Sequence, residues 1–202
     1  MATAGGTLVL AVATFSSIRT SNRSARLAER ALLAGLRPLL VPSREDDLTE
    51  RVRFGDGVIL EVPGHGGALE PQKGNLYMAL ALRNGGSGLA VIHGWVARTG
   101  ERSGTPIRPE LSEFHRQQRD LYIPAGETGF WQGAIRDRED PAYAGLAEAD
   151  AHGERVMVDL LYGDHEGGQR TITRFGISSS QDPNGPRAEV LRYWNVDGAA
   201  PR

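Results

Sequence analysis

The segment Leu76-Tyr77-Met78-Ala79-Leu80-Ala81-Leu82-Arg83 decides the fold class, because its large apolar residues recur at every second position. Positions 76, 78, 80 and 82 fall on one face of a strand, since successive strand side chains point to opposite sides. The glycine-rich stretch 84–88 follows, and residues 89–97 then resume the pattern. We expect the two segments to form a hairpin or the corner of a β-sandwich, with 76, 78, 80 and 82 facing the core.

Short strand-like segments separated by turn residues continue on both sides of this pair. Upstream, residues 52–54 and 58–62 flank Gly55-Asp56-Gly57. Five more follow downstream, at residues 120–123, 128–135, 155–162, 170–178 and 189–196. Many short strands with regular turns are typical of a sandwich or a barrel. We therefore predict a mainly β domain over residues 38–202, an antiparallel β-sandwich of the immunoglobulin-like kind.

Helices are expected in few places. Residues 141–151 form the clearest short helix of the β domain, because Asp140 is a good N-cap, Pro141 suits the first helical position and Gly153 follows the last turn. The proline-punctuated segment 105–118 is expected to cross between the two sheets, with two helical turns over residues 109–118.

Composition limits the classes of protein. The 202 residues are 40% hydrophobic and 24% charged, which suits one folded domain with some additional chain. The absence of cysteine excludes disulfides, thiolate metal sites and cysteine nucleophiles. A net charge of −2 argues against a nucleic-acid partner.

Charge is concentrated at the N-terminus. Residues 1–44 hold six arginines against Glu29 alone, a net +5, so the rest of the chain carries −7. Residues 2–18 are uncharged, and the arginines follow them. Three interpretations stay open: a signal peptide cleaved after Ala11-Val12-Ala13, a buried helix of a soluble domain, or a slightly short membrane anchor. The abrupt arginine boundary favours the anchor, with the following domain in the cytoplasm.

The helical pattern continues to Leu36, where Gly35 and Pro38 end it. We therefore predict one long N-terminal helix over residues 1–37, a membrane anchor with a basic stalk, in a single-pass protein of the cell membrane. Small residues recur at every fourth position, at Ala13, Ser17, Ser21 and Ala25, which is a weak indication of self-association. The arginine-rich face of this predicted helix is suited to binding anionic lipid.

Four stretches of the chain resemble uncharacterised single-pass membrane proteins of actinobacteria. They are residues 18–30 (IRTSNRSARLAER), 36–38 (LRP), 82–88 (LRNGGSG) and 160–171 (LLYGDHEGGQRT). The last is similar to the final hairpin of an immunoglobulin-like sandwich in that group. The resemblance implies a membrane tether and a sandwich fold, and it implies no activity.

Two motifs offer incomplete chemistry. Gly64-His65-Gly66-Gly67 is similar to an esterase oxyanion loop, but the chain lacks the G-x-S-x-G nucleophile elbow that such enzymes require. Asp164-His165-Glu166 carries three metal-ligating side chains in succession, and adjacent residues rarely converge on one ion. We interpret the first motif as a turn and the second as a solvated polar turn.

Two carboxylates and four aromatic residues are further candidates for a site. Asp159 and Asp120 are candidates for paired carboxylates, but the alternation of strand 155–162 places Asp159 on a solvent face. Trp95, Trp131 and the pair Tyr193-Trp194 form either a sugar or peptide platform or, more commonly, part of the core.

The sequence therefore favours a non-enzymatic, membrane-tethered β-sandwich protein that presents a protein-interaction surface. We expect no catalytic, cofactor or metal residues. The expected partners are membrane lipid, another protein and a second copy of the chain, without nucleic acid. The alternative is a soluble enzyme or small-ligand-binding sandwich that uses polar loops around His65, His93 and Asp164.

Overall fold

The computed structural model describes residues 17–29, 31–32, 35–100, 107–179, 182–183 and 185–197. The chain divides into two compact units, residues 1–36 and 37–202. In the first unit, residues 17–29 form an α-helix, and every side chain described there is exposed. The helix is 13 residues long, so the expected single long helix is not shown. The uncharged segment before it lies outside the described residues, apart from residues 17 and 18.

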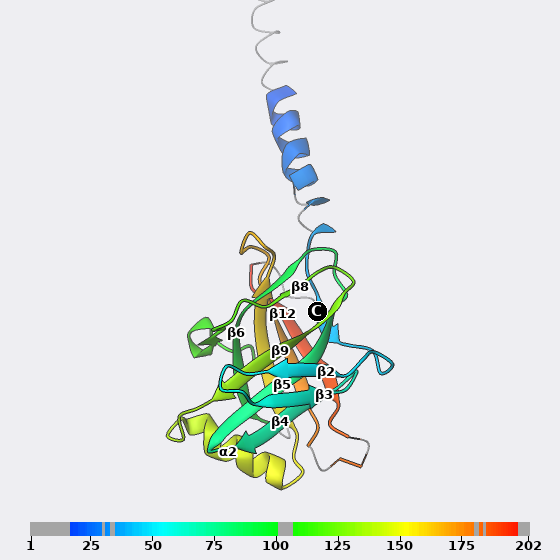
Figure 1. Cartoon of the computed structure of the whole chain (residues 1–202). Helices are drawn as coiled ribbons and strands as arrows, with labels where there is room; N and C mark the ends of the chain where they lie inside the picture. The colour runs from blue at the N-terminus through cyan, green and yellow to red at the C-terminus, as the bar shows by residue number, and fades with distance from the viewer. Residues whose placement is uncertain are drawn as a thin grey trace, which may run out of the picture. The chain divides into compact units, whose positions relative to one another are not determined.

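The second unit is built mainly from strands (Figure 1). In chain order the elements are β1 (Leu40–Pro42), β2 (Glu50–Arg53), β3 (Ile59–Val62), β4 (Gly67–Gln72), β5 (Asn75–Asn84), β6 (Ala90–Thr99), the 3-10 helix η1 (Leu111–Glu113), β7 (His115–Arg116), β8 (Tyr122–Ile123), β9 (Thr128–Ile135), α2 (Pro141–Ala151), β10 (Val156–Gly163), β11 (Thr171–Ile177) and β12 (Ala188–Asn195).

All strand pairs are antiparallel and fall into two sheets and a hairpin. In the first sheet β5 is central, with β9 along one edge and β4 and β1 along the other. The second sheet has the order β12-β11-β10-β6, with the short strands β7 and β8 on the far edge of β6. β2 and β3 pair only with each other within the described ranges. The mainly β, antiparallel prediction is confirmed, and an immunoglobulin-like strand order is not shown.

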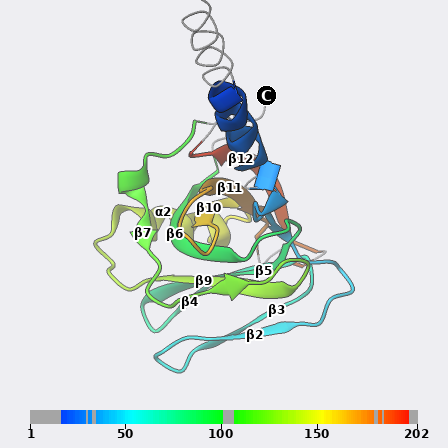
Figure 2. The ribbon, with the colours of Figure 1, turned by 90° about the horizontal axis from the view of Figure 1, so that it is seen from above.

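Both faces of β5 are buried, so this strand contributes to both apolar clusters of the domain. Its alternating set Leu76, Met78, Leu80 and Leu82 is fully buried in the main core against the second sheet. The opposite face, with Tyr77 and two alanines, packs under the β2–β3 hairpin in a second apolar cluster. Figure 2 shows the resulting layers, with β2 and β3 outside β4, β5 and β9, and the second sheet beyond. The predicted core face is confirmed, and the other face is also covered.

Asn84 stabilises the turn through which the chain passes from β5 in the first sheet to β6 in the second. Its Oδ1 accepts hydrogen bonds from the backbone N–H groups of Leu39 (3.1 Å) and Gly86 (3.0 Å). Its Nδ2 donates to the carbonyls of Gly88 (2.6 Å) and Ile123 (2.9 Å). Because β5 and β6 belong to different sheets, this turn links the two sheets, and the hairpin alternative is wrong.

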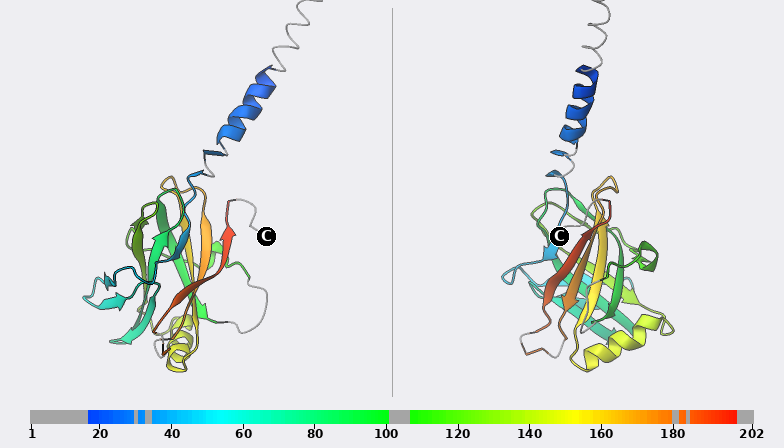
Figure 3. Two further views of the ribbon diagram at one scale, coloured as in Figure 1. Left: turned by 90° about the vertical axis from the view of Figure 1, so that its right-hand side faces the viewer. Right: turned by 180° about the vertical axis from the view of Figure 1, so that it is seen from behind.

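The helix at residues 141–151 is confirmed as α2, at one end of the β domain (Figure 3). Asp140 accepts a hydrogen bond from the Ala142 N–H at 2.9 Å, as an N-cap does. The two helical turns expected over 109–118 are wrong. Only η1 forms there, and β7 follows because residues 115 and 116 pair with β6. A non-local strand partner overrides the weak local helix preference.

Candidate functional site

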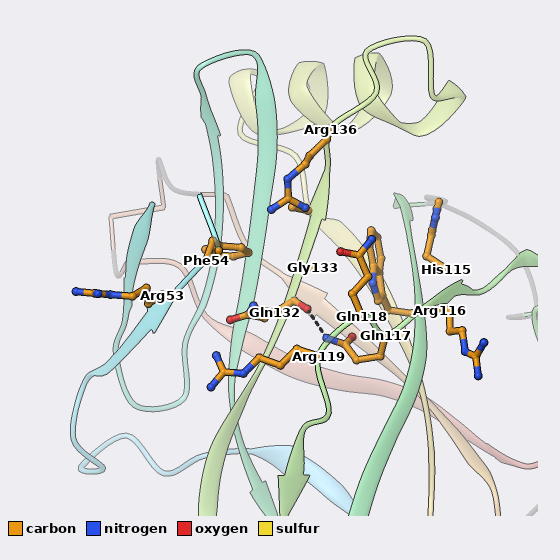
Figure 4. A pocket seen from close by; sticks show the side chains of 13 residues that line it. Arg53, Phe54, His115, Arg116, Gln117, Gln118, Arg119, Gln132, Gly133 and Arg136 are labelled. Atoms are coloured by element: carbon orange, nitrogen blue, oxygen red, sulfur yellow. Dashed lines mark hydrogen bonds between the residues drawn. The ribbon is translucent and has the colours of Figure 1, made fainter. Parts of the chain in front are cut away.

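A groove of about 750 Å³ is lined by β9, β6, the end of β2 and residues 115–119 (Figure 4). Its lining residues are Arg53, Phe54, Gly55, Trp95, His115, Arg116, Gln117, Gln118, Arg119, Gln132, Gly133, Ala134 and Arg136. Four arginines, one histidine and three glutamines stand among them, and no carboxylate does. The volume lies in the usual range of ligand pockets.

Aromatic rings and one glutamine build the floor of the groove. The Trp95 ring stacks on His115, with centroids 4.6 Å apart, and meets the buried Trp131 edge-on at 5.6 Å. The Trp131 indole N–H donates to Gln117 Oε1 at 3.2 Å. The other end of this carboxamide, Nε2, donates to the Gln132 backbone carbonyl at 3.2 Å. The floor is therefore preorganised by two buried tryptophans and the half-buried Gln117.

The arginines of the groove differ in how they are compensated. Arg53, Arg116 and Arg119 form no ion pair within the described part of the chain, although the Arg119 guanidinium lies 5.9 Å from the Phe130 ring centre. In Figure 4, Arg119 and Arg136 approach Gln132 and Gly133 from opposite sides, and Arg53 and Arg116 lie at the margins. These cations belong to a region of the chain that carries net negative charge.

Arg136 is the compensated member of the set. Its Nη2 lies 3.4 Å from Asp56 Oδ2, and the same oxygen accepts a 2.6 Å hydrogen bond from the Tyr77 hydroxyl. That hydrogen bond, together with Arg136, lowers the pKa of Asp56. Burial is the main cause that raises the pKa of Tyr77. Tyr77 therefore stays a neutral donor that fixes Asp56, and Asp56 in turn orients Arg136.

A smaller hollow of about 210 Å³ adjoins the groove on the side of Arg136. Asp137 and Asp140 line this hollow together with His115 and Arg136. His115 Nε2 lies 3.9 Å from Asp140 Oδ2, which forms an ion pair when the histidine is protonated. The groove itself is thus lined by cations, whereas the adjoining hollow near α2 carries side chains of both charges.

The three residues of the alternative hypothesis are only partly brought together. His93 and Asp164 lie near each other and near Arg170, and the charges of Asp164 and Arg170 both influence the pKa of His93. Burial, followed by the charge of Arg170, lowers the pKa of His93, and Asp164 opposes that shift. His65 instead contacts Ser43: the backbone N–H of His65 donates a hydrogen bond to Ser43 Oγ at 3.0 Å. None of the three lines the groove.

The Asp164-His165-Glu166 turn is stabilised by Asp164 itself. Its Oδ1 accepts hydrogen bonds from the N–H groups of Glu166 (3.1 Å) and Gly168 (2.8 Å), and the side chain is nearly buried. His165 and Glu166 are exposed. Asp164 is therefore a buried turn cap, whereas the solvated-turn prediction holds for its two neighbours. Within the described ranges no group of three metal-ligating side chains is found.

Asp159 does not face solvent, so that prediction is wrong. It is completely buried, and it accepts two hydrogen bonds from Arg174, at 2.7 and 2.9 Å. Arg98 approaches it at 3.6 Å, and Arg174 also donates to the carbonyl of Ile107. Arginine side chains and the chain near Ile107 thus cover the outer face of β10. Asp120, the other candidate carboxylate, is exposed.

The interpretation of the tryptophans as core residues is confirmed. Trp131 is fully buried, and Trp95 and Trp194 are 5% and 7% exposed. Trp95 nevertheless reaches the floor of the groove, so one aromatic ring serves both the core and the candidate site.

No known protein family, curated protein sequence or solved structure matches the chain. The resemblance to actinobacterial membrane proteins therefore stays a prediction.

Sequence reasoning missed the groove because its residues come from four separate segments. One signal was present: the polar run His115-Arg116-Gln117-Gln118-Arg119 interrupts the strand pattern. Nothing in the sequence indicated that Arg53 and Arg136 lie beside it.

Proposed function

We propose that the chain is a non-enzymatic binding protein, held at the cell membrane by its N-terminal segment, whose β-sandwich domain presents the arginine groove to another protein. The observation that carries the proposal is the groove, with several uncompensated guanidinium groups on an otherwise acidic chain. Its arginines, glutamines and aromatic rings are the side chains that bind carboxylates and peptide groups in protein interfaces.

The N-terminal helix supports the membrane part of the proposal. All its described side chains are exposed, including Arg19, Arg23 and Arg26, and Ile18 and Leu27 are more than half exposed. A 13-residue helix is marginal in water without a surface to cover its apolar side chains. An anionic membrane surface satisfies both kinds of residue, because the acyl-chain boundary covers the apolar side chains and the headgroups pair with the arginines.

The described residues contain no helix with the length and hydropathy needed to span a bilayer. The proposed single pass therefore depends on the uncharged residues 2–18. The arginines that follow this segment favour a cytoplasmic β domain.

The membrane part is tested with the full chain fused to a fluorescent protein and fractionated by high-speed centrifugation. We expect signal at the cell boundary and recovery in the pellet. The triple variant Arg19→Gln/Arg23→Gln/Arg26→Gln should move protein to the supernatant or invert its orientation, because it removes the charge boundary. Arg155→Gln/Arg187→Gln/Arg192→Gln, three exposed arginines of the β domain, is the matched control. Diffuse signal with complete recovery of the unaltered chain in the supernatant would refute the tether.

The binding part is tested at the groove of the membrane-bound chain. A photo-crosslinking residue at position 118 should give a discrete covalent adduct with one protein, and Arg116→Gln/Arg119→Gln should abolish it. The same residue placed at position 192 is the control. Equal adducts at both positions, or none at position 118, would count against a specific protein-binding groove.

A further inference from the structure

The edge of β9 that faces the groove is unpaired. The Asn84 N–H donates to the Glu127 carbonyl, and the Gly126 N–H donates to the Asn84 carbonyl, so even-numbered residues of β5 direct their backbone groups toward β9. Their partners in β9 are odd-numbered residues, such as Trp131 and Gly133. The alternate residues of β9, among them Gln132, point their N–H and C=O groups away from β5. Within the described ranges β5 is the only strand that pairs with β9.

A side chain already occupies one position of the missing neighbour. Gln117 Nε2 donates to the Gln132 carbonyl, as the backbone N–H of an added strand would. Gln132 Oε1 is enclosed and has no hydrogen-bond partner among the described residues. An enclosed acceptor without a partner is costly, and a bound group that donates to it, directly or after rotation of the carboxamide, removes that cost.

The charges around this edge select the partner. Arg119 and Arg136 flank Gln132, and Arg53 and Arg116 lie at the two margins of the same groove. Side chains of an added strand that reach either margin of the groove would therefore meet a guanidinium group. Exposed edges without protection attract further strands, and recognition by strand addition combines backbone hydrogen bonds with side-chain selection.

We infer that an extended, acidic segment of a partner protein adds to the free edge of β9 as a further strand, displacing the Gln117 carboxamide, with its carboxylates on the groove arginines. This inference rests on the proposed protein-binding role of the groove and names the chemical class of the partner.

The test measures binding of three fluorescent ten-residue peptides to the full chain by fluorescence anisotropy. The first alternates glutamate with valine or threonine, the second replaces each glutamate by glutamine, and the third keeps the glutamates but places proline at alternate positions. We expect the first peptide to bind at least tenfold more tightly than either of the others, and its affinity to fall as salt rises. The proline peptide keeps the charge and lacks half of the backbone donors, so it separates strand addition from simple charge attraction.

Variants of the chain locate the binding. Arg116→Gln/Arg119→Gln should weaken the first peptide at least fivefold, whereas Arg155→Gln/Arg192→Gln should leave its affinity unchanged. Gln132→Pro removes a backbone donor that β5 does not use, so it should abolish binding while the urea midpoint stays close to that of the unaltered chain. Amide exchange gives a readout that does not depend on these variants: the Gln132 and Ala134 N–H groups should become protected when the first peptide binds.

Four outcomes would overturn the inference. They are equal binding of the glutamate and proline peptides, no protection of the Gln132 N–H, binding of inorganic phosphate or single-stranded nucleic acid in preference to the acidic peptide, and a self-associated chain whose second copy fills the β9 edge. Each leaves the fractionation result unaffected, so failure of strand addition is distinguishable from failure of the tether. A position-118 adduct with a protein that carries no acidic extended segment would retain the proposed function and reject this inference.

Discussion

Arginines in two parts of the β domain differ in whether a carboxylate of the chain pairs with them. On the outer face of the second sheet, Arg174 is 7% exposed, forms a two-point ion pair with Asp159 and lies 5.2 Å from the Trp194 ring centre. In the groove, Arg116 and Arg119 are exposed, and neither has a carboxylate partner in the described chain. The buried Arg174 thus has its counter-charge within the chain, whereas Arg116 and Arg119 have none there, and we propose that a partner supplies it.

The largest expected effect comes from breaking the compensated pair. Asp159→Asn removes the counter-charge and leaves the Arg174 guanidinium buried, which should lower the free energy of unfolding by about 3–5 kcal/mol. Urea denaturation followed by tryptophan fluorescence measures it. The control is Asp159→Leu/Arg174→Met, which removes both charges and should recover most of the loss. A loss below about 1 kcal/mol in the single variant would show that Arg174 is not structural.

Asn84 tests the same principle for a neutral polar group. Asn84→Ala leaves two backbone N–H groups and two carbonyls without their partner at the β5–β6 corner, so stability should fall by about 2–3 kcal/mol in the same assay. Asn84→Asp keeps an acceptor oxygen for the two backbone N–H groups but turns a second oxygen toward the carbonyls of Gly88 and Ile123. It should therefore be no more stable than the alanine variant, and a stable aspartate variant would contradict the assigned hydrogen bonds.

Local patterns predicted the β5 strand, the two strand segments on either side of the turn 55–57, and α2, because period, turn residues and capping residues all occupy adjacent positions. The same patterns could not show that Tyr77 is covered, since the hairpin that covers it reaches it only in three dimensions. Asp159 was misplaced for the same reason. Its counter-charge, Arg174, stands directly opposite on β11, and that register depends on the turn between the two strands.

The groove marks the limit of sequence reasoning more sharply. Its charge comes from four arginines in separate places: Arg53 in β2, Arg116 in β7, Arg119 between β7 and β8, and Arg136 directly after β9. The net charge of the chain is slightly negative, so composition concealed a local concentration of cations. A site of this kind becomes visible only when β9 is placed beside residues 115–119.

The uncompensated arginines give the opposite expectation for stability. Arg116→Gln and Arg119→Gln should each change the free energy of unfolding by no more than about 0.5 kcal/mol, because exposed side chains without partners contribute little to folding. The same urea assay measures this effect. A loss above about 1.5 kcal/mol from either substitution would mean that these arginines hold the fold together, and the contrast with Arg174 would disappear.

His93 is intermediate between the two groups and gives the smallest predicted effect. Its side chain is half-buried, its Nε2 has no hydrogen-bond partner among the described residues, and Arg170 lies nearby. Burial and Arg170 lower the pKa of His93 below its ordinary value of 6.5. The unfolded chain therefore binds more protons at this position as the pH falls below 6.5, while folded His93 remains neutral until its own lower pKa is reached.

Stability attributable to neutral His93 is complete above pH 6.5 and decreases as the pH falls from 6.5 through the folded pKa. The measurement is the difference in free energy of unfolding between the unaltered chain and His93→Gln, followed from pH 7.5 to pH 5. This difference should shift against the unaltered chain as the pH falls, because glutamine takes up no proton in either state. Groups that the two proteins share contribute equally and cancel in this difference. A flat difference, or one that favours the unaltered chain in acid, would mean that Asp164 outweighs Arg170 and that His93 belongs with the compensated group.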